Sequence, residues 1–302
     1  TMALTNGGTF FSFWLGNNDV LGYATGGASN PAIYTSTTDF ETWFRTGLGA
    51  LLSVPGTKGV VANIPNVTDI PYFTTINNGL ITPAANGCAP GSAPSSALPF
   101  SLTAEQAAGL NMQYAAAGIN PDFKEGKVNY FLITTPTGVR QMDPAKDLLI
   151  LTTPTDSLGL GELKNCDCTT KGLRKGWGIT KPIATNWVLD EAEVADITKR
   201  VEDFNGIIKT VVEEAANNER LALVDINKIF GEVANWTKVV NGINFTASIA
   251  PPFGAFSLDG VHPNARGSAF IANQFIDAIN TKFGSSIPTV NPNNYPGNDL
   301  PQ

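Results

Sequence analysis

Two apolar runs near the N-terminus flank an amphipathic segment, and together they predict a βαβ unit. Residues 9–15 are apolar and aromatic with little interruption, which is typical of a strand buried on both faces of a parallel sheet. Residues 40–54 repeat apolar side chains at helical spacing after Asp39, a predicted N-cap, and a Pro-Gly pair ends them. Residues 59–65 form the second apolar run. The crossover between the two strands is expected to be right-handed.

A polar tetrad follows the first predicted strand. Residues 16–19 read Gly-Asn-Asn-Asp and stand at the carboxyl end of that strand, where open α/β sheets bind their ligands. Residues 22–38, which are rich in Gly, Ser and Thr, are predicted to form a loop before the helix.

The regular alternation of strands and helices breaks down in the middle of the chain. Residues 84–99 and 159–178 have the composition of loops. The pattern still predicts a Thr-capped helix without a full capping box over residues 103–117, and two strands, able to pair as a hairpin, over residues 128–134 and 147–153. We interpret residues 74–187 as an insertion or cap that decorates an α/β core.

Regular periodicity returns in the last third of the chain. It predicts helices over residues 191–217, 226–236 and 265–283, and a short strand over residues 221–225. Residues 239–249 fit either kind of element. The predicted core therefore comprises residues 1–73 and 188–283, and the Pro- and Asn-rich residues 284–302 are interpreted as a tail.

The composition is that of a folded protein with little charge. A chain of 302 residues, 42% hydrophobic and 15% charged, can bury a sizeable core in one large domain or two average ones. Its abundant Gly, Pro, Asn and Thr favour an exported protein with long surface loops. A net charge of −7 without a block of Lys or Arg argues against nucleic acid as a partner. No apolar run reaches the roughly 18 residues of a transmembrane helix.

The three cysteines, Cys88, Cys166 and Cys168, do not form the even-numbered set of a disulfide framework. Cys88 can pair with one of the others in a secreted protein. The Cys-x-Cys pair lacks a second pair and a nearby histidine, so a structural or incidental role is favoured over zinc binding.

The single histidine of the chain, His262, stands three residues after Asp259 and shortly before the last predicted helix. A histidine is the natural general base near neutral pH, and it needs an acceptor on one ring nitrogen to select its tautomer. The intervening Gly260 and the following Pro263 predict a tight turn in which Asp259 reaches Nδ1. A surface histidine beside a helix cap is the simpler alternative.

The Gly-x-Asn-Asp after a strand and the Asp-x-x-His before the last helix together resemble blocks III and V of the SGNH (GDSL-type) hydrolase family. The resemblance covers about residues 8–73 and 188–283. Each motif alone is weak, but here both occur in the family's order and local context. The resemblance implies an α/β, three-layer flavodoxin-like fold with a parallel sheet, here lacking its first strands and carrying a large insertion.

The resemblance also implies a role for each matched residue. His262 would take the proton of a nucleophilic serine, Asp259 would orient His262, and the side-chain amide of Asn18 would donate to the oxyanion. The alternative for Asn18 is a turn residue that caps the strand end. Asp19 is expected to bond backbone, and no metal or organic cofactor is implied.

The nucleophile is missing from the expected place. The family's Gly-Asp-Ser-Leu should precede Gly16, and neither it nor the family's second block is found there. Ser157, in the near match Asp-Ser-Leu-Gly, lies inside the insertion and is the less favoured candidate. The N-terminal residues also show no signal-peptide pattern. We therefore expect a segment that begins downstream of the first two strands, with little activity of its own.

The expected parent function is that of a bacterial, extracytoplasmic serine esterase or lipase acting on a small-molecule, lipid or carbohydrate ester. The first alternative is a non-catalytic domain on the same scaffold that binds carbohydrate or a protein partner. A metal site at Cys166 and Cys168 is the second. Acyl length, alcohol and oligomeric state stay open.

Overall fold

The computed structural model describes residues 8–81, 100–159, 162–164, 171–173, 175–235, 238–240 and 242–298. The chain divides into two compact units. Unit one contains the segment up to Ala24, Asn30–Pro71 and Asp196–Asp299, and unit two contains Thr25–Ser29 and Tyr72–Ala195. The predicted insertion, residues 74–187, falls within the range of unit two. The three cysteines lie outside the described residues.

Unit one is a mixed α/β structure built on a parallel sheet of three strands in the order β1-β2-β11. Its strands are β1 (Phe10–Phe13), β2 (Lys58–Ala62), β11 (Leu221–Val224) and the antiparallel pair β12 (Lys238–Val240) and β13 (Ile243–Phe245). Its helices are α2 (Asn17–Thr25), α3 (Thr37–Leu52), α6 (Glu191–Glu213, shared with unit two), α7 (Ile226–Ala234), α8 (Ala265–Phe283) and the 3-10 turns η1 (Pro31–Ile33), η2 (Val67–Asp69) and η5 (Pro292–Asn294).

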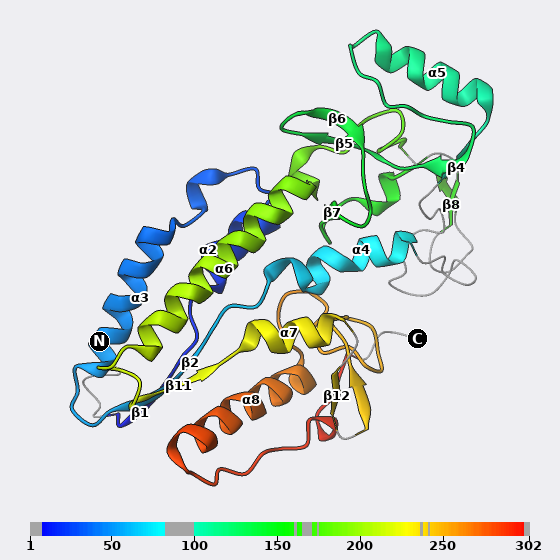
Figure 1. Cartoon of the computed structure of the whole chain (residues 1–302). Coiled ribbons are helices and arrows are strands. Elements are labelled where there is room, and N and C mark those ends of the chain that lie inside the picture. Colours follow the sequence, from blue (N-terminus) through cyan, green and yellow to red (C-terminus); the bar gives the residue numbers. More distant parts are fainter. Residues whose placement is uncertain are drawn as a thin grey trace. The chain divides into compact units, whose positions relative to one another are not determined.

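Helices cover the sheet of unit one on both faces. Helix α8 packs on β11 and β2. On the other side, Phe44 of α3 meets Phe13 of β1 edge to face, with ring centroids 5.3 Å apart. The ring of Phe40 stacks on Phe204 of α6 at 3.9 Å. Figure 1 shows the three strands between these two helix layers.

Strand β1 differs from the prediction of a strand buried on both faces. It is an edge strand, since among the described residues only β2 pairs with it. Phe10 is 44% exposed, Ser12 is also exposed, and Phe13 is buried. The central strand β2 is the one with the continuous burial that an apolar run predicts.

The segment predicted as a loop over residues 22–38 is a loop in part, since helices occupy both of its ends and a 3-10 turn interrupts it. Helix α2 begins directly at Asn17 and ends at Thr25, and η1 follows. The predicted N-cap of the next helix is also wrong, because Ser36, not Asp39, caps α3 by accepting from the backbone N–H of Asp39 at 3.1 Å. Short polar helices such as α2 have a weak amphipathic signal, so periodicity does not reveal them.

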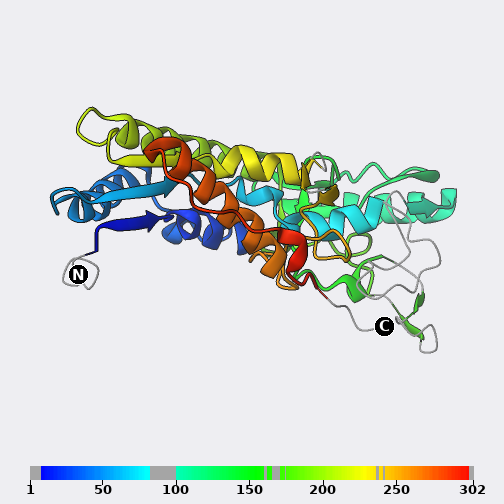
Figure 2. The ribbon, with the colours of Figure 1, turned by 90° about the horizontal axis from the view of Figure 1, so that it is seen from below.

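The C-terminal segment, interpreted from its composition as a tail, is hydrogen-bonded along α8. Asn273 holds both the N–H and the carbonyl of Val290, and Asn280 holds those of Ile287. Figure 2 shows this segment turning back along α8 after the helix ends at Phe283, with Gly284 as a left-handed C-cap.

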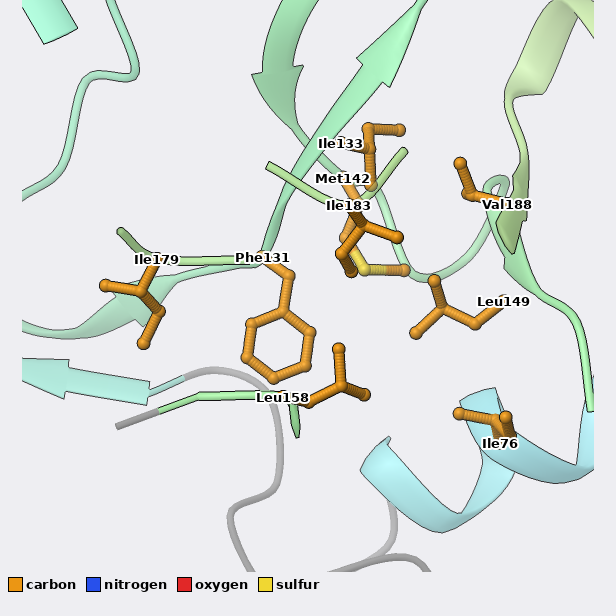
Figure 3. Close-up of a cluster of buried hydrophobic side chains, with 9 residues drawn as sticks. All are labelled: Ile76, Phe131, Ile133, Met142, Leu149, Leu158, Ile179, Ile183 and Val188. Atoms are coloured by element: carbon orange, nitrogen blue, oxygen red, sulfur yellow. The ribbon is translucent and has the colours of Figure 1, made fainter. Parts of the chain in front are cut away.

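Unit two consists of short strands and helices. The helices are α4 (Pro71–Ile81), α5 (Ala104–Ala115) and the 3-10 turns η3 (Thr155–Ser157) and η4 (Thr185–Trp187). The antiparallel pairs are β3 (Phe100–Leu102) with β4 (Gly126–Asn129), β5 (Leu132–Thr135) with β6 (Gly138–Gln141), β7 (Leu148–Leu149) with β10 (Val188–Leu189), and β8 (Glu162–Lys164) with β9 (Lys171–Leu173). Figure 3 shows the apolar cluster around Phe131, Ile133, Leu149 and Ile183 that these elements enclose.

Three predictions for unit two need correction. Helix α5 carries a full capping box, because Gln106 reaches back to the Thr103 N–H at 3.0 Å while Thr103 accepts from the Gln106 N–H. The two predicted strands do not pair as a hairpin. Instead β5 pairs with β6 and β7 pairs with β10, and β8 and β9 occupy part of a predicted loop.

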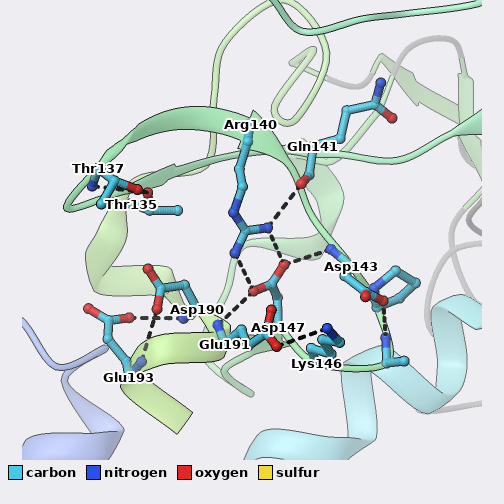
Figure 4. Close-up of polar contacts among 12 residues, drawn as sticks. Thr135, Thr137, Arg140, Gln141, Asp143, Lys146, Asp147, Asp190, Glu191 and Glu193 are labelled. Carbon is cyan, nitrogen blue, oxygen red and sulfur yellow. Dashed lines mark hydrogen bonds and ion pairs between the residues drawn. The ribbon is translucent and has the colours of Figure 1, made fainter. Parts of the chain in front are cut away.

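Asp147 joins three parts of unit two through one buried carboxylate (Figure 4). Arg140 donates to both of its oxygens at 2.6 and 2.7 Å, and the backbone N–H groups of Asp143 and Glu191 donate at 2.6 and 2.8 Å. The side chain of Asp147 is fully buried, so these donors replace the water that its charge has lost.

Candidate active site in unit one

A small hairpin-like turn presents the histidine. Phe256 and Pro263 form an antiparallel bridge, and the Ser257 N–H donates to the carbonyl of His262 at 2.7 Å. Gly260, at the tip, has a φ of +72°, which favours glycine because a side chain is strained there. The predicted tight turn at this motif is therefore present.

The turn places the Asp259 carboxylate against the imidazole. Oδ2 of Asp259 lies 2.7 Å from Nδ1 of His262. Oδ1 accepts three further hydrogen bonds, from Ser257 Oγ at 2.7 Å, the Val261 N–H at 2.8 Å and the His262 N–H at 2.9 Å. With the proton on Nδ1, the ring donates to Asp259 and Nε2 is left as an acceptor. This is the arrangement that a general base requires.

The hydrogen bonds keep Asp259 ionised. Burial by itself raises the pKa of this carboxyl. The donors on Oδ1 and the imidazole lower the pKa by more than burial raises it, so the net result is a pKa well below the ordinary value. Asp259 therefore carries its negative charge throughout the neutral range, where it favours a proton on the facing nitrogen of His262.

Asn18 and His262 line the same pocket of unit one, although one stands near the start of the sequence and the other near its end. The pocket has a volume of about 500 Å³, within the roughly 300–1,000 Å³ of small-molecule sites. Much of its wall is apolar, formed by residues such as Trp14, Leu15, Val67 and Phe230. No Lys or Arg is among the described residues that line it, so it offers no cation to an anionic ligand.

Gly16 and Asp19 determine the local structure on either side of Asn18. Gly16 has a φ of +112°, and an added Cβ would lie 2.7 Å from Ile64 Cδ1 and 2.8 Å from Phe40 Cε2. Only glycine fits there, so the chain can turn directly from β1 into α2. Asp19 accepts from the Thr35 hydroxyl at 2.9 Å, a side-chain contact where a backbone contact was expected.

The sequence did not single out two polar groups beside this site. Nε1 of Trp14 and Oδ1 of Asn17 are buried and have no hydrogen-bond partner among the described residues. Both residues line the pocket. Asn17 is the second residue of the Gly-x-Asn-Asp motif and Trp14 stands two positions before it, so their place directly after β1 was the available signal.

No described residue of the pocket wall is a Ser, Thr or Cys. Ser257, although next to the motif, donates to Asp259 and belongs to the turn. Ser157 lies in η3 of unit two and is only 2% exposed, which is poor access for a nucleophile. Among the described residues, a histidine that is hydrogen-bonded to a carboxylate and an asparagine side chain therefore lie at one pocket.

The described residues contain no cluster of three or more His, Cys, Asp or Glu side chains able to hold a metal ion. Within the same residues, no helix is both long and apolar enough to cross a bilayer. Comparisons of the chain with protein-family models, with curated proteins and with solved structures find no match.

Proposed function

We propose that the chain carries the base half of a serine ester hydrolase of the SGNH type. The observation that carries this proposal is the pairing of His262 with Asp259 at 2.7 Å on the wall of a pocket that Asn18 also lines. The parallel sheet β1-β2-β11 supports the flavodoxin-like arrangement that the motifs suggest, with the Gly-x-Asn-Asp motif directly after β1 and the Asp-x-x-His motif shortly before α8.

The proposed chemistry is acyl transfer from an ester to serine and then to water. Nε2 of His262 accepts the serine proton as Oγ attacks the ester carbonyl, and Asp259 stabilises the imidazolium that forms. The Asn18 amide donates to the oxyanion of the tetrahedral intermediate. His262 then protonates the leaving alcohol, and a water molecule repeats the sequence to release the acid.

We propose that the serine comes from a segment encoded upstream of Thr1. The pocket wall supports this, because its described residues supply no hydroxyl or thiol. The edge strand β1 supports it further, since its outer edge is unpaired among the described residues and Phe10 and Leu15 are 44% and 60% exposed. Another strand on this edge would cover apolar surface and could end beside the pocket.

The substrate is proposed to be a carboxylic ester of a small molecule, a lipid or a sugar, met outside the cytoplasm. The apolar wall suits an uncharged acyl or alcohol group better than an anionic one. The experiment is hydrolysis of p-nitrophenyl acetate by the chain alone and by the gene product extended upstream of Thr1, each with His262 and with His262→Ala.

We expect turnover from the extended protein, its loss in His262→Ala, and little turnover from the chain alone. Turnover that is absent, or unaffected by His262→Ala, contradicts the hydrolase and favours the alternative of a binding domain on the same scaffold. Robust hydrolysis by the chain alone that Ser157→Ala abolishes would instead show that the nucleophile lies in unit two.

A further inference from the structure

We propose that the C-terminal segment, residues 284–298, positions the Asp259–His262 pair, and that Asn298 is the positioning residue. This inference rests on the proposed function for its catalytic meaning. Its structural part, that Asn298 determines how the imidazole is held, can be tested without any hydrolysis.

The segment is anchored at successive points along unit one. Asn280 and Asn273 of α8 hold Ile287 and Val290, each through two hydrogen bonds of 2.7 to 2.9 Å. Asn293 donates to the carbonyl of Val240 at 3.3 Å. These contacts use side-chain amides on backbone groups, so the path of the segment is determined residue by residue.

The last described residue of the segment reaches the turn itself. Nδ2 of Asn298 donates to the carbonyl of Phe256 at 2.7 Å and to that of Ile249 at 2.8 Å. Phe256 directly precedes Ser257, the residue that donates to Asp259. Two residues before Asn298, the carbonyl of Pro296 accepts from the N–H of Arg266, in the first turn of α8. The segment thereby ties the helix start to the base of the turn.

Phe256 is the point at which the turn is attached to the rest of unit one. Its side chain is 2% exposed and meets Phe230 edge to face, with ring centroids 5.7 Å apart. Its carbonyl accepts from Asn298 and also from Asn264 at 3.2 Å. Of these two donors, Asn264 belongs to the turn and helix start, and Asn298 comes from the C-terminal segment.

The functional side chains beyond this point have little packing of their own. The side chains of His262 and Asp259 are 77% and 51% exposed. Their orientation therefore depends on the backbone of the turn and on its hydrogen bonds. A shift of Phe256 moves Ser257, whose N–H and hydroxyl hold the carbonyl of His262 and Oδ1 of Asp259. Asn298 acts on the imidazole through this path.

The test uses the fact that His262 is the only histidine of the chain. Its ring ¹⁵N resonances report the tautomer without assignment ambiguity. We expect the Nδ1–H tautomer in the native chain, and in Asn298→Ala a shift towards the Nε2–H tautomer of free histidine. The matched control is Asn280→Ala, which releases the same segment at Ile287, away from the turn. Asn298→Gln, which keeps the amide donor, should restore part of the native spectrum.

Unchanged ring resonances in a folded Asn298→Ala variant would overturn the proposal, as would an equal change in Asn280→Ala. If Asn298→Ala does not fold, Asn298→Asp, which keeps the size of the side chain but loses the amide donor, takes its place: a shift towards the Nε2–H tautomer supports the amide contact, and native resonances contradict it. When Asn298→Ala is made in the extended protein, we expect kcat to fall by up to about 10²-fold, which is the effect of misplacing a catalytic group by about 1 Å, with KM little changed. If neither the extended protein nor the chain alone hydrolyses the ester, the proposed function is refuted. The positioning role of Asn298 would still be tested by the ring resonances.

Discussion

Asn264 joins helix α8 to the carbonyl of Phe256. Its Oδ1 accepts from the Gly267 N–H at 2.9 Å as the N-cap of α8, while its Nδ2 donates to the carbonyls of Gly254 at 2.9 Å and Phe256 at 3.2 Å. One side chain, 8% exposed, thus caps the start of the helix and holds the backbone at Phe256, where the histidine turn begins.

Replacement of Asn264 is expected to cost stability in two separable parts. Asn264→Ala removes the cap, worth about 1 kcal/mol, and the two amide bonds, each worth about 1 kcal/mol. Asn264→Ser can keep the cap and loses the amide bonds. The free energy of unfolding measured in urea should therefore be lower for Asn264→Ser than for the native protein, and lowest for Asn264→Ala. Ser36→Ala, which removes a cap without such a second contact to a turn, should cost about 1 kcal/mol; an equal loss in all three variants would contradict the double role.

Asp259→Asn tests the orientation of His262 in the extended protein. The substitution keeps the size of the side chain but offers an amide where the carboxylate faced Nδ1 at 2.7 Å. His262 is then expected to take the wrong tautomer, and kcat/KM for p-nitrophenyl acetate should fall on the scale of about 10⁴ known for this change in a Ser-His-Asp triad. The control is Asp277→Asn, an exposed carboxylate on α8. A loss below about tenfold would exclude the orienting role.

Asn18→Ala tests the oxyanion donor against its neighbour. Both Asn17 and Asn18 line the pocket at the start of α2. We expect Asn18→Ala to lower kcat by about 10²–10³ with KM little changed, since the donor acts in the transition state. Asn17→Ala, assayed in parallel, should show a much smaller decrease in kcat. The reverse order of the two losses would reassign the donor to Asn17.

The elements with strong hydrophobic periodicity could be predicted from the sequence. Helix α8 was predicted with the bounds the structure has, Ala265–Phe283, because its apolar residues repeat at helical spacing over five turns. Strands β2 and β11 were also found, since both are short apolar runs in the buried sheet. The Asp259 contact with His262 followed from a spacing of three residues across a turn.

Features that depend on single side-chain contacts could not be predicted. The C-terminal segment has the composition of a tail, and single hydrogen bonds, among them those of the Asn273, Asn280 and Asn298 amides, fix it to unit one. Such contacts join residues far apart in sequence and leave no periodic pattern. Helix α2 was missed for a related reason, since its first turn is polar and Gly22 lies within it.

Gly267→Ala tests how closely α8 approaches the turn. A Cβ at this position would overlap the carbonyl oxygen of Ala255, nearer than real Cβ atoms approach, and the obstacle is backbone that cannot swing aside. We expect a destabilisation of about 1–3 kcal/mol or more by urea unfolding. Gly206→Ala in α6, where no atom lies within 4 Å of the added methyl group, should instead stabilise by about 0.5–1 kcal/mol. Equal effects of the two would contradict the close approach.

Glu193 is expected to make unit two less stable as the pH rises. It caps the start of α6, accepting from the Asp190 N–H at 2.9 Å. Burial first, and then the charges of Asp190 and Asp147, raise its pKa to about 7 from an ordinary value of 4.5. Because the folded state holds this proton more tightly than the unfolded state, the stabilisation is complete below pH 4.5 and is lost as the pH rises through about 7.

Glu193→Gln should remove this dependence while it keeps an oxygen for the Asp190 N–H. Urea unfolding at pH values from 5 to 8 is expected to give a shallower pH dependence than in the native protein and a higher stability at pH 8. Glu191→Gln is the matched control, because Glu191 stands two positions earlier, is 57% exposed and pairs with Lys146. It should keep the native slope. A native slope in Glu193→Gln as well would show that another group releases the proton.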